Sequence, residues 1–368
     1  MHPGSGFPPE RVRPIASAMS RSATITSAEG LASAGLINES EAAAAADVSQ
    51  RYAIRVTPEM SALMVGPDGA AIRSQFIPDP AELNTAPGEL LDPIGDDAHS
   101  PVPGVVHRYP DRVLLKPVSV CPVYCRFCFR RETVGAAPAM TPDELSVAFA
   151  YIESHPEIWE VILTGGDPLM LKPTVLARII SRLDAIPHVT IVRIHTRVPI
   201  ADPGRISVDM IAAIKTSPRL TPYVSVHCNH PAELTDASRA AAGRLADVGL
   251  PLLGQTVLLK GVNDDVDVLT RLMRGLVAAR IRPYYLHHPD LAPGTARFQM
   301  DIAEGQALAA ALRGKVSGLC QPTYVLDTPG GFGKAPLAEG HAGKTAEGWR
   351  IRDPFGRDHA YPPVIKLD

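Results

Sequence analysis

The sequence predicts an α/β protein whose core is a partial or full (βα) barrel, preceded by an N-terminal helical extension. From about Arg112 onward, short apolar runs alternate with helix-length amphipathic segments, and the unit recurs about every 30 residues, the size of a βαβ crossover. This alternation is typical of a parallel sheet with helices outside it. The number of units favours a barrel over an open sheet, and reactive side chains gather at strand ends, where barrels carry their chemistry.

The chain divides into four predicted regions. Residues 1–25 are rich in Pro, Ser and Arg and are expected to be disordered. Residues 26–105 hold the helical stretches SAEGLASAGL and SEAAAAADVSQRYAI, followed by a connector at 78–103 whose Pro, Asp and Gly content suits either an ordered wrapping loop or a linker. Residues 106–340 are predicted to form the barrel core, and residues 341–368 a C-terminal extension.

Within the core, apolar runs bounded by turn residues predict seven strands. Helices are expected between consecutive strands. The clearest begins at Thr141, where Thr141 and Glu144 make the capping-box pattern before an amphipathic run. The predicted strands are 113–120, 161–167, 189–196, 223–228, 252–259, 283–288 and 323–327.

Charge, hydrophobicity and cysteine content argue against several classes of protein. A net charge of −3 over 368 residues argues against non-specific nucleic-acid binding, which normally shows as a basic patch. No apolar run reaches the ~20 residues that cross a bilayer, and the N-terminus lacks the apolar core of a secretory signal. The five cysteines are odd in number and clustered, unlike a disulfide framework, so we expect a protein of the reducing cytoplasm.

Polar and nucleophilic side chains follow the predicted strands at a common position. Because the ends of barrel strands meet around one opening, we expect these side chains to line a single pocket. Purely structural roles, as caps, turn residues or satisfied core histidines, would instead scatter them. The residues are Cys121, Asp167, His195, Arg197, His227, Gln255, His287, Asp290 and Asp327.

Three of the five cysteines, Cys121, Cys125 and Cys128, lie within the stretch CPVYCRFC. A zinc site usually needs four ligands, often as two CxxC pairs, and Cys228 and Cys320 are single. A chance cluster of structural thiols is the second interpretation, disfavoured by the scarcity of cysteine in this chain. The third is an iron–sulfur cluster, because three thiolates can hold three irons of a four-iron cluster and leave the fourth open to a small molecule.

The spacing CxxxCxxC after the first strand of such a barrel resembles the radical S-adenosylmethionine (SAM) superfamily, and TGGDP at 164–168 strengthens the resemblance. The resemblance implies a 4Fe-4S cluster on the three clustered cysteines, SAM on its open iron and an external electron donor. It also implies that the glycine turn, here Gly165, Gly166 and Asp167, contacts the methionine amino group of SAM. A turn with an N-capping aspartate is the plainer interpretation, and both can hold together.

Further stretches look like the lysine 2,3-aminomutase family over roughly residues 75–340. They are SPVPGVVHRYPDRVLL, CRFCFRRETVG, HCNHPAELT, GQTVLLKGVNDD, RPYYLHHPDLAPGTARF and VLDTPGGFGKAP. This resemblance implies a further cofactor, pyridoxal 5′-phosphate (PLP), held on Lys334 in a glycine-rich loop. The family loop often has another glycine where this chain has Phe332, but the three remaining glycines still permit close backbone approach.

The resemblance also implies an amino acid substrate. Arg130 matches the arginine that pairs with the substrate carboxylate, and a guanidinium can grip a carboxylate through two parallel hydrogen bonds. Asp290 and Asp327 match the two aspartates that hold the distant ammonium group. Two carboxylates suit a cationic side chain and disfavour glutamate, although arginine is cationic too. The implied reaction moves the 2-amino group of L-lysine to carbon 3 and gives L-β-lysine.

Other residues match family positions near the cofactors. Arg112 and Gln255 lie where family members contact the PLP phosphate or its neighbourhood. His227 lies where a SAM contact is expected, and His195 and Arg197 are expected to line the adenosyl end. For each histidine, a hydrogen-bonding role in the core is an equal alternative.

The chain departs from well-known clostridial relatives at two places. Those relatives join subunits through a zinc site with a cysteine after VND and others near the C-terminus. Here that position is Asp265, and no cysteine follows Cys320, so we expect any homo-oligomer to lack this zinc. His287 stands where those relatives have tyrosine, and a branch acting on a lysine destined for elongation factor P carries histidine there. The tail at Asp327 favours free lysine instead.

Three alternatives therefore stand beside a lysine aminomutase. The first is an aminomutase for another amino acid, and the second is one that supplies the elongation factor P pathway. The third is a non-catalytic iron–sulfur or zinc module, which would have no need for a PLP lysine at position 334.

Overall fold

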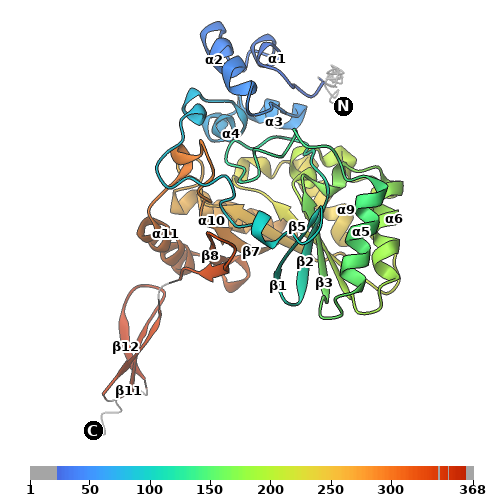
Figure 1. The fold of residues 1–368 in the computed structure, drawn as a ribbon. Helices are drawn as coiled ribbons and strands as arrows, with labels where there is room; N and C mark the ends of the chain where they lie inside the picture. The colour runs from blue at the N-terminus through green and yellow to red at the C-terminus, as the bar shows by residue number, and fades with distance from the viewer. Residues whose placement is uncertain (1–22, 339, 347, 362–368) are drawn as a thin grey trace, which may run out of the picture.

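The computed structural model describes residues 23–338, 340–346 and 348–361. The segment expected to be disordered, residues 1–25, lies almost entirely outside the described residues. Figure 1 shows helices at the N-terminal end, a curved central sheet with helices around it, and a small C-terminal sheet. No helix in the described part of the chain is long and apolar enough to span a membrane.

Four short helices precede the sheet and lie at one end of it (Figure 1). Local capping chemistry sets where they begin: Asn38 and Glu41 form a capping box at α2, and the Thr57 side chain accepts a hydrogen bond from the Met60 amide at α3. Each helix adds buried apolar side chains to the main core. The helices are α1 (Ala28–Ser33), α2 (Glu39–Ser49), α3 (Pro58–Leu63) and α4 (Gly69–Phe76).

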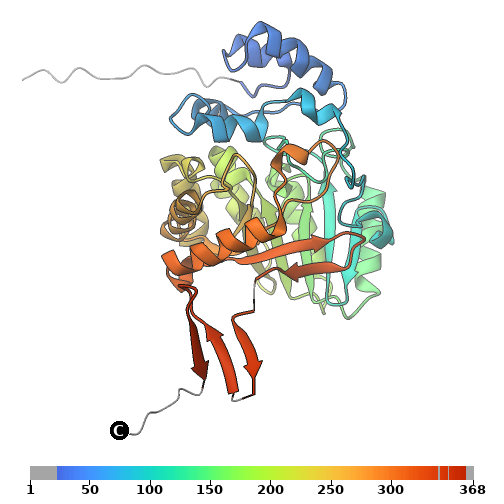
Figure 2. The ribbon, with the colours of Figure 1, turned by 90° about the vertical axis from the view of Figure 1, so that its left-hand side faces the viewer.

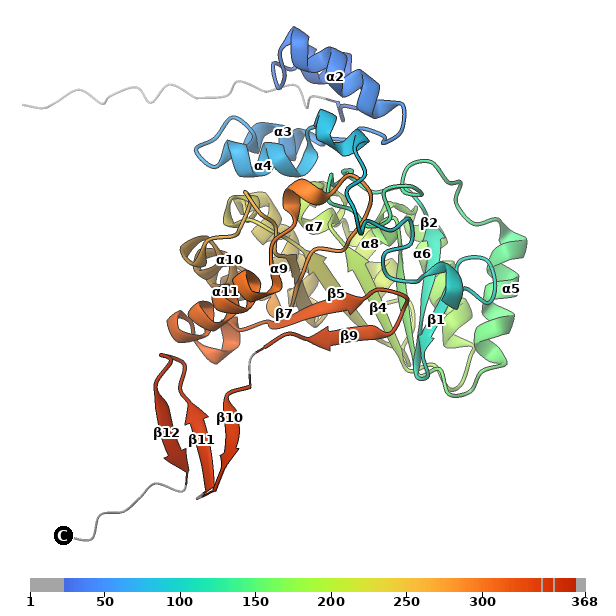
Figure 3. The same cartoon turned by 60° about the vertical axis from the view of Figure 1, so that its left-hand side comes forward.

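Nine strands form one sheet in sequential order. Strands β2 to β8 pair in parallel, whereas β1 and β9 pair antiparallel at the two edges. The sheet curves into a partial barrel, so the predicted fold class is confirmed (Figure 3). The strands are β1 (Val105–Tyr109), β2 (Arg112–Val118), β3 (Glu160–Gly165), β4 (Ile191–Thr196), β5 (Thr221–His227), β6 (Leu252–Val257), β7 (Arg282–His287), β8 (Thr323–Thr328) and β9 (Gly333–Pro336).

Helices cover the outside of the barrel, and several of them present apolar side chains at helical spacing. In α6 the buried residues are Leu176, Ile179, Ile180 and Leu183, the i, i+3, i+4, i+7 set of an amphipathic helix. The capping box expected before α5 is present. The helices are α5 (Pro142–Glu153), α6 (Pro173–Asp184), α7 (Val198–Ala201), α8 (Val208–Ile214), α9 (Asp236–Asp247), α10 (Val266–Ala278) and α11 (Ile302–Lys315).

Short 3₁₀ turns lie in the loops, including those after β3 and β5 that reach the site. The turns after β3 and β5 are preceded by Asp167 and His230, whose side chains accept backbone hydrogen bonds as caps. The turns are η1 (Pro80–Leu83), η2 (Asp97–His99), η3 (Pro168–Met170), η4 (Pro203–Arg205), η5 (Pro231–Glu233), η6 (Ala296–Phe298) and η7 (Gly318–Cys320).

The sequence does not predict the two antiparallel edge strands. β1 and β2 form a hairpin around a Pro-Asp pair, residue types that favour turns. β9 begins directly after the glycine-rich loop, so Lys334 lies in a strand rather than in the loop itself. Gly330, Gly331 and Gly333 have positive φ, a backbone conformation that residues other than glycine rarely adopt. This conformation lets the chain reverse from β8 into β9.

The C-terminal extension forms a second, separate antiparallel sheet beyond the barrel (Figure 2). Its three strands pair in sequential order, so neighbouring strands are joined by short connections. They are β10 (Ala342–Thr345), β11 (Gly348–Arg352) and β12 (Asp358–Tyr361).

The connector between α4 and β1 wraps the barrel rather than acting as a linker (Figure 3). The Leu90 amide donates to the Leu291 carbonyl at 2.7 Å, which ties the connector to the loop after β7. A Cβ atom on Gly95 would lie 2.4 Å from the amide nitrogen of Gly331, so only glycine fits there. The connector therefore lies directly against the loop that leads to Lys334.

Candidate active site

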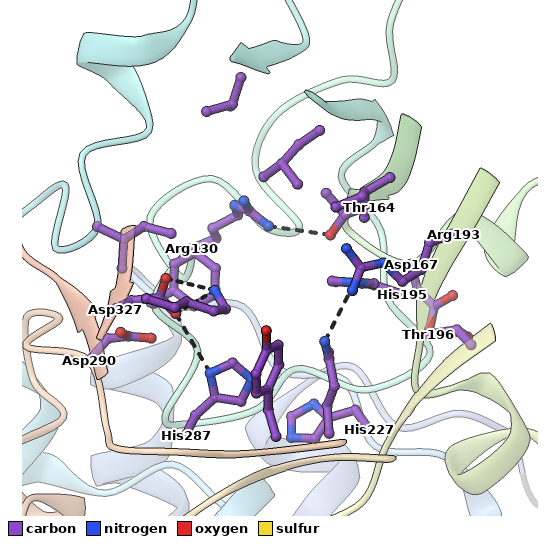
Figure 4. Close-up of a pocket in the computed structure, with 18 of the residues that line it drawn as sticks. Arg130, Thr164, Asp167, Arg193, His195, Thr196, His227, His287, Asp290 and Asp327 are labelled. Atoms are coloured by element: carbon purple, nitrogen blue, oxygen red, sulfur yellow. Dashed lines mark hydrogen bonds and ion pairs between the residues drawn. The ribbon is translucent and has the colours of Figure 1, made fainter. Parts of the chain in front are cut away.

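A cavity of about 480 Å³ lies inside the barrel, lined mainly from the strands and the loops that follow them (Figure 4). Of the site residues expected from the sequence, Gly165 alone is absent from its lining. The strand ends thus bring side chains from distant parts of the chain to one space. The expected residues that line it are Arg112, Cys121, Cys125, Cys128, Arg130, Gly166, Asp167, His195, Arg197, His227, Gln255, His287, Asp290, Asp327 and Lys334.

The three clustered cysteines lie in the loop that follows β2. Backbone bonds hold this loop to the N-terminal region, from the Tyr124 amide to the Arg55 carbonyl (3.0 Å) and from the Arg126 amide to the Gln75 carbonyl (2.8 Å). Burial raises the pKa of all three thiols, that of Cys128 to about 11, so metal binding at neutral pH would have to displace protons.

The arrangement of the thiols bears on the kind of metal centre that they could hold. Nowhere in the described ranges do three or more His, Cys, Asp or Glu side chains converge as they would around one metal ion. A cluster does not need that convergence, because each of its irons takes a separate thiolate. The donor set of three cysteines on one loop fits a four-iron cluster.

Arg197 supports the cysteine loop from the end of β4. Its guanidinium donates to Cys125 Sγ at 2.9 Å, to Glu233 Oε2 at 2.7 Å and to Gln75 Oε1 at 2.8 Å. Burial would lower the pKa of Arg197, but Cys125 and Glu233 outweigh it and raise the pKa, so the side chain stays charged. Arg197 lines the cavity and at the same time places a fixed positive charge beside the Cys125 thiol.

The glycine turn after β3 packs closely against the end of β2 and the start of the cysteine loop. A Cβ atom on Gly165, whose φ is +105°, would lie 2.5 Å from the Val118 carbonyl oxygen. A Cβ atom on Gly166 would lie 2.6 Å from the Ser119 carbonyl carbon. Both positions therefore need glycine, and the turn holds its backbone against the cysteine loop.

Asp167 follows this turn and is fully engaged in hydrogen bonds. Its carboxylate accepts from the Leu169 amide (3.0 Å), the Thr196 hydroxyl (2.9 Å) and the Arg197 amide (2.7 Å). Burial raises its pKa to about 6, against the effect of these bonds. Asp167 thus caps the turn, holds the end of β4 in place through hydrogen bonds, and also lines the cavity.

Two histidines on neighbouring strands face the cavity as neutral rings. Burial lowers the pKa of both His195 and His227. His195 Nε2 lies 3.5 Å from Gln255 Nε2, so it can accept a weak hydrogen bond from that amide (Figure 4). His227 Nε2 lies 3.0 Å from Asn229 Oδ1 and can donate to it. Each ring therefore has one nitrogen held by the protein.

Two further arginines, Arg112 and Arg193, line the cavity. Arg112 bonds Asp111 at 2.6 Å and lies over the Tyr109 ring at 3.7 Å, while Arg193 pairs with a carboxylate of β3. Burial raises the pKa of Tyr285, and the charges of Arg193 and Arg112 oppose that shift. The Arg193 guanidinium lies 5.9 Å from the centre of the adjacent Tyr284 ring. An anionic group such as a phosphate would have to compete there with Asp111 and Glu160 for these two cations. Sequence reasoning had singled out Arg112 but not Arg193.

Lys334 and Asp327 are cross-strand neighbours in β9 and β8. Lys334 Nζ lies 2.7 and 2.8 Å from the two oxygens of Asp327, and His287 Nδ1 lies 3.6 Å from the same carboxylate (Figure 4). Burial alone would raise the pKa of Asp327, but His287 and Lys334 outweigh it and lower the pKa. Asp290 behaves oppositely: burial, followed by the charge of Asp327, raises its pKa to about 7.

Arg130 lines the same cavity, and its shortest hydrogen bonds are made by one edge of the guanidinium. Its Nη1 lies 3.4 Å from Thr164 Oγ1 (Figure 4). Its Nε and Nη2 donate to Asp96 Oδ2 at 2.9 and 2.8 Å. Sequence reasoning missed Asp96, and also Arg108, which bridges Asp96 (3.0 Å) and Asp327 (3.6 Å). The composition of the connector indicated only a loop, so no local signal pointed to Asp96.

Comparison with known proteins agrees with this arrangement. The Radical SAM superfamily profile matches residues 115–273, which contain the three cysteines and the glycine turn. The chain is 40% identical over 303 residues to the L-lysine 2,3-aminomutase of Fusobacterium nucleatum, which covers 82% of this chain and 71% of that protein. The chain belongs to the lysine 2,3-aminomutase family.

Members of the lysine 2,3-aminomutase family differ in length and in the substrate that they are named for. The L-lysine 2,3-aminomutase of Clostridium subterminale is 44% identical over 267 residues, which is 72% of this chain and 64% of that protein. The glutamate 2,3-aminomutase of Clostridioides difficile is 36% identical over 275 residues, which is 72% of this chain and 65% of that protein. This chain therefore spans less than two thirds of both proteins.

The residues present fit the two cofactors that the radical SAM superfamily implies, a 4Fe-4S cluster and SAM. Three cysteines on one loop line the cavity, and Arg197 supplies a cation beside one of their thiols. The glycine turn holds backbone groups next to that loop, where a small polar molecule could be recognised.

Proposed function

We propose that the protein is a radical SAM, PLP-dependent aminomutase that moves the 2-amino group of L-lysine to carbon 3 and gives L-β-lysine. One observation carries the proposal: Arg130, the carboxylates of Asp290 and Asp327, and the amine of Lys334 line the same cavity as the cysteines. Lysine carries a carboxylate at one end and an ammonium group at the other. The cavity offers a partner for each, together with an amine that can hold PLP.

Arg130 binds the substrate carboxylate, and Asp290 and Asp327 bind the side-chain ammonium group. In the free protein the pKa of Asp290 is about 7, so this carboxyl is partly protonated at neutral pH. An arriving ammonium group favours the ionised form and so lowers that pKa. A glutamate side chain would instead bring a third carboxylate to the pair, which is unfavourable in a buried site. This is the reason for preferring lysine over glutamate.

When bound, the cluster and SAM would supply hydrogen-atom abstraction, and PLP would supply a carbonyl group that can bind an amino nitrogen. The three cysteines would hold the cluster and Lys334 would hold PLP. The barrel walls exclude water from the reacting atoms. Reduction of the cluster calls for an external electron donor, and the reducing cytoplasm suits its thiolate ligands. The SAM side would be lined by Gly165, Gly166, Asp167, His195, Arg197 and His227, and the PLP phosphate side by Arg112 and Gln255.

A second candidate shares this chemistry but differs in the destination of the product. His287 lies 3.6 Å from Asp327 and lines the cavity, at the position where the branch serving elongation factor P carries histidine. In that case the β-lysine formed would be transferred to a protein. The aspartate and glycine pattern that begins at Asp327 favours the first candidate, because the branch serving elongation factor P lacks it in its tail.

The test is anaerobic incubation of the reconstituted protein with a reductant, SAM, PLP and one amino acid at a time, with the product identified by NMR. Lysine should be converted into β-lysine, and glutamate should be recovered unchanged. Conversion of glutamate but not lysine would overturn the substrate assignment. Zinc without iron in the purified protein, together with no PLP bound, would favour a non-catalytic module.

A further inference from the structure

Asp96 lies in the connector, and the proposed function assigns it no role. Its position is fixed from the backbone, because the amides of Asp96 and Asp97 donate to the two carboxylate oxygens of Asp92, both at 2.8 Å. The Ser100 hydroxyl donates to the Asp96 carbonyl at 2.8 Å. On the other side, Gly95 packs against the glycine-rich loop. The side chain is thus held behind the cavity lining, against Arg130, with only 9% of it exposed.

Three cations surround the Asp96 carboxylate. Arg130 donates to Oδ2 from Nε and Nη2 at 2.9 and 2.8 Å, and Arg108 Nη2 donates to Oδ1 at 3.0 Å. Lys116 Nζ lies 3.8 Å from Oδ2. Burial alone would raise the pKa of Asp96, but these cations outweigh it and hold the pKa below its ordinary value. The ionised Asp96 carboxylate therefore offsets the mutual repulsion of the three cations around it.

Arg108 extends this set of ion pairs to the other end of the cavity. Its Nη1 lies 3.6 Å from Asp327 Oδ1, and both side chains are less than a tenth exposed. Arg130, Asp96, Arg108 and Asp327 thus form one chain of buried charges. It joins the residue proposed for the substrate carboxylate to a residue proposed for the substrate ammonium group.

The geometry also determines which part of Arg130 is open to a ligand. Asp96 takes the edge formed by Nε and Nη2, while Nη1 makes only the 3.4 Å contact with Thr164. A substrate carboxylate must therefore approach from the side of Nη1. A guanidinium without the Asp96 anchor could rotate about its long, flexible side chain and lose this orientation.

We propose that Asp96 is a positioning residue that fixes the orientation of Arg130 and, through Arg108, its spacing from Asp327. The site then selects an α-amino acid whose cationic side chain has the length of lysine. This inference rests on the proposed function, because it needs Arg130 to be the partner of the substrate carboxylate.

Removing the Asp96 charge has two opposing effects on lysine binding. Loss of a negative charge near the substrate carboxylate would strengthen its attraction to Arg130. Loss of the anchor, however, leaves Arg130, Arg108 and Lys116 as buried cations without their shared counter-ion, which is strongly unfavourable unless they move apart. Since these side chains would reorganise, the positioning effect outweighs the attraction and lysine binding weakens.

The test compares lysine with 1,5-diaminopentane, which keeps both amino groups but lacks the carboxylate. Holoenzyme carrying cluster and PLP is titrated with each compound, and binding is followed by the change in PLP absorption. In Asp96→Asn the lysine affinity should fall at least tenfold, while the diamine affinity stays within about twofold of wild type. Arg130→Gln should show the same pattern. In turnover, the KM for lysine should rise by more than kcat falls.

Two further variants separate positioning from damage to the fold. Asp97→Asn removes the exposed neighbouring carboxylate and should leave both affinities unchanged. Asp96→Glu keeps the charge and should recover part of the lost lysine affinity. Iron content and the thermal midpoint are measured for each variant. If Asp96→Asn fails to hold its cofactors, Asp96→Glu decides alone, since a longer carboxylate displaces Arg130 and should weaken lysine but not the diamine.

Unchanged or tighter lysine binding in the Asp96 variants would overturn the proposal. An equal loss of lysine and diamine binding would also overturn it, because that result indicates general damage. Failure of the wild-type protein to isomerise lysine would instead overturn the proposed function, so the two failures are distinguishable.

Discussion

The two ends of the cavity are held together in different ways. At the cysteine end, Arg197 bonds Cys125 and two residues that are completely buried, Glu233 and Gln75. At the other end, Asp327 shares its charge among several groups, and its main partner Lys334 is 28% exposed. The contacts of Arg197 are buried and fixed. The ion pairs of Asp327 are partly accessible, so a charged ligand can replace one of its partners. A cluster needs a fixed frame, and a substrate needs charges that can change partners.

The largest expected effect comes from removing the amine of the exchangeable end. Lys334 is the lysine that lines the cavity in the described part of the chain, so Lys334→Ala should leave PLP without a covalent attachment. The absorption of lysine-bound PLP and its fixation by borohydride should disappear, and isomerase activity should fall below detection. Iron content should remain that of wild type. Retention of the PLP absorption would show that another residue holds the cofactor.

Breaking the fixed end should damage stability and cluster together. Arg197→Met leaves Glu233 buried without its cation, a change that typically costs about 3–5 kcal/mol in the free energy of unfolding. We expect less iron per chain after reconstitution, with PLP still attached to Lys334. Denaturant unfolding and iron analysis provide the measurements. Arg182→Met, on the exposed face of α6, is the matched control and should change stability by no more than about 0.5 kcal/mol. Normal iron content in Arg197→Met would contradict a supporting role.

Asp327→Asn tests whether the exchangeable end recognises the ammonium group. Truncating one partner of a buried charge pair costs on the order of 2–5 kcal/mol, so kcat/KM for lysine should fall by roughly 30-fold or more. SAM cleavage by the reduced cluster should be affected much less, because the cysteine end is unchanged. The two rates are measured on the same preparation by product NMR and by release of cleaved SAM. Unchanged lysine kinetics would remove the charge argument for the substrate.

The same difference explains what the sequence could and could not predict. The seven parallel strands and the cysteine loop follow from local patterns, namely apolar periodicity and CxxxCxxC, and the sheet confirms the fold class. The Asp96–Arg130 and Arg108–Asp327 pairs join residues far apart in the chain, and nothing local states which carboxylate meets which guanidinium. Both edge strands were likewise missed because each pairs on only one side and is short. The cysteine motif could be predicted because its residues are close in the sequence. The ion pairs could not be predicted because only folding brings their residues together.

The pH dependence of lysine binding offers a smaller effect at the exchangeable end. Burial raises the pKa of Asp290 to about 7, so this carboxyl is protonated in the free protein below that pH. Lysine affinity should therefore rise with pH up to about 7, by at most roughly tenfold per pH unit. At Asp290 the native state holds a proton that the unfolded chain has lost, so this residue's contribution to the free energy of unfolding should fall as pH rises from about 4 to 7. Asp290→Asn should flatten both dependences, and identical pH profiles in the two proteins would count against this ionisation.

The smallest expected effect comes from Phe332, where the family loop often has glycine. The Phe332 side chain is 85% exposed, while its neighbours Gly330 and Gly331 have positive φ and make the turn. Phe332→Gly should therefore keep PLP attached and change stability by no more than about 1 kcal/mol, mostly through added freedom of the unfolded chain. Gly331→Ala is the contrasting change, since its Cβ would lie 2.4 Å from the His99 ring at a strained φ. It should displace the loop and weaken PLP attachment. Loss of PLP in Phe332→Gly, or none in Gly331→Ala, would show that the glycine backbone does not set the position of Lys334.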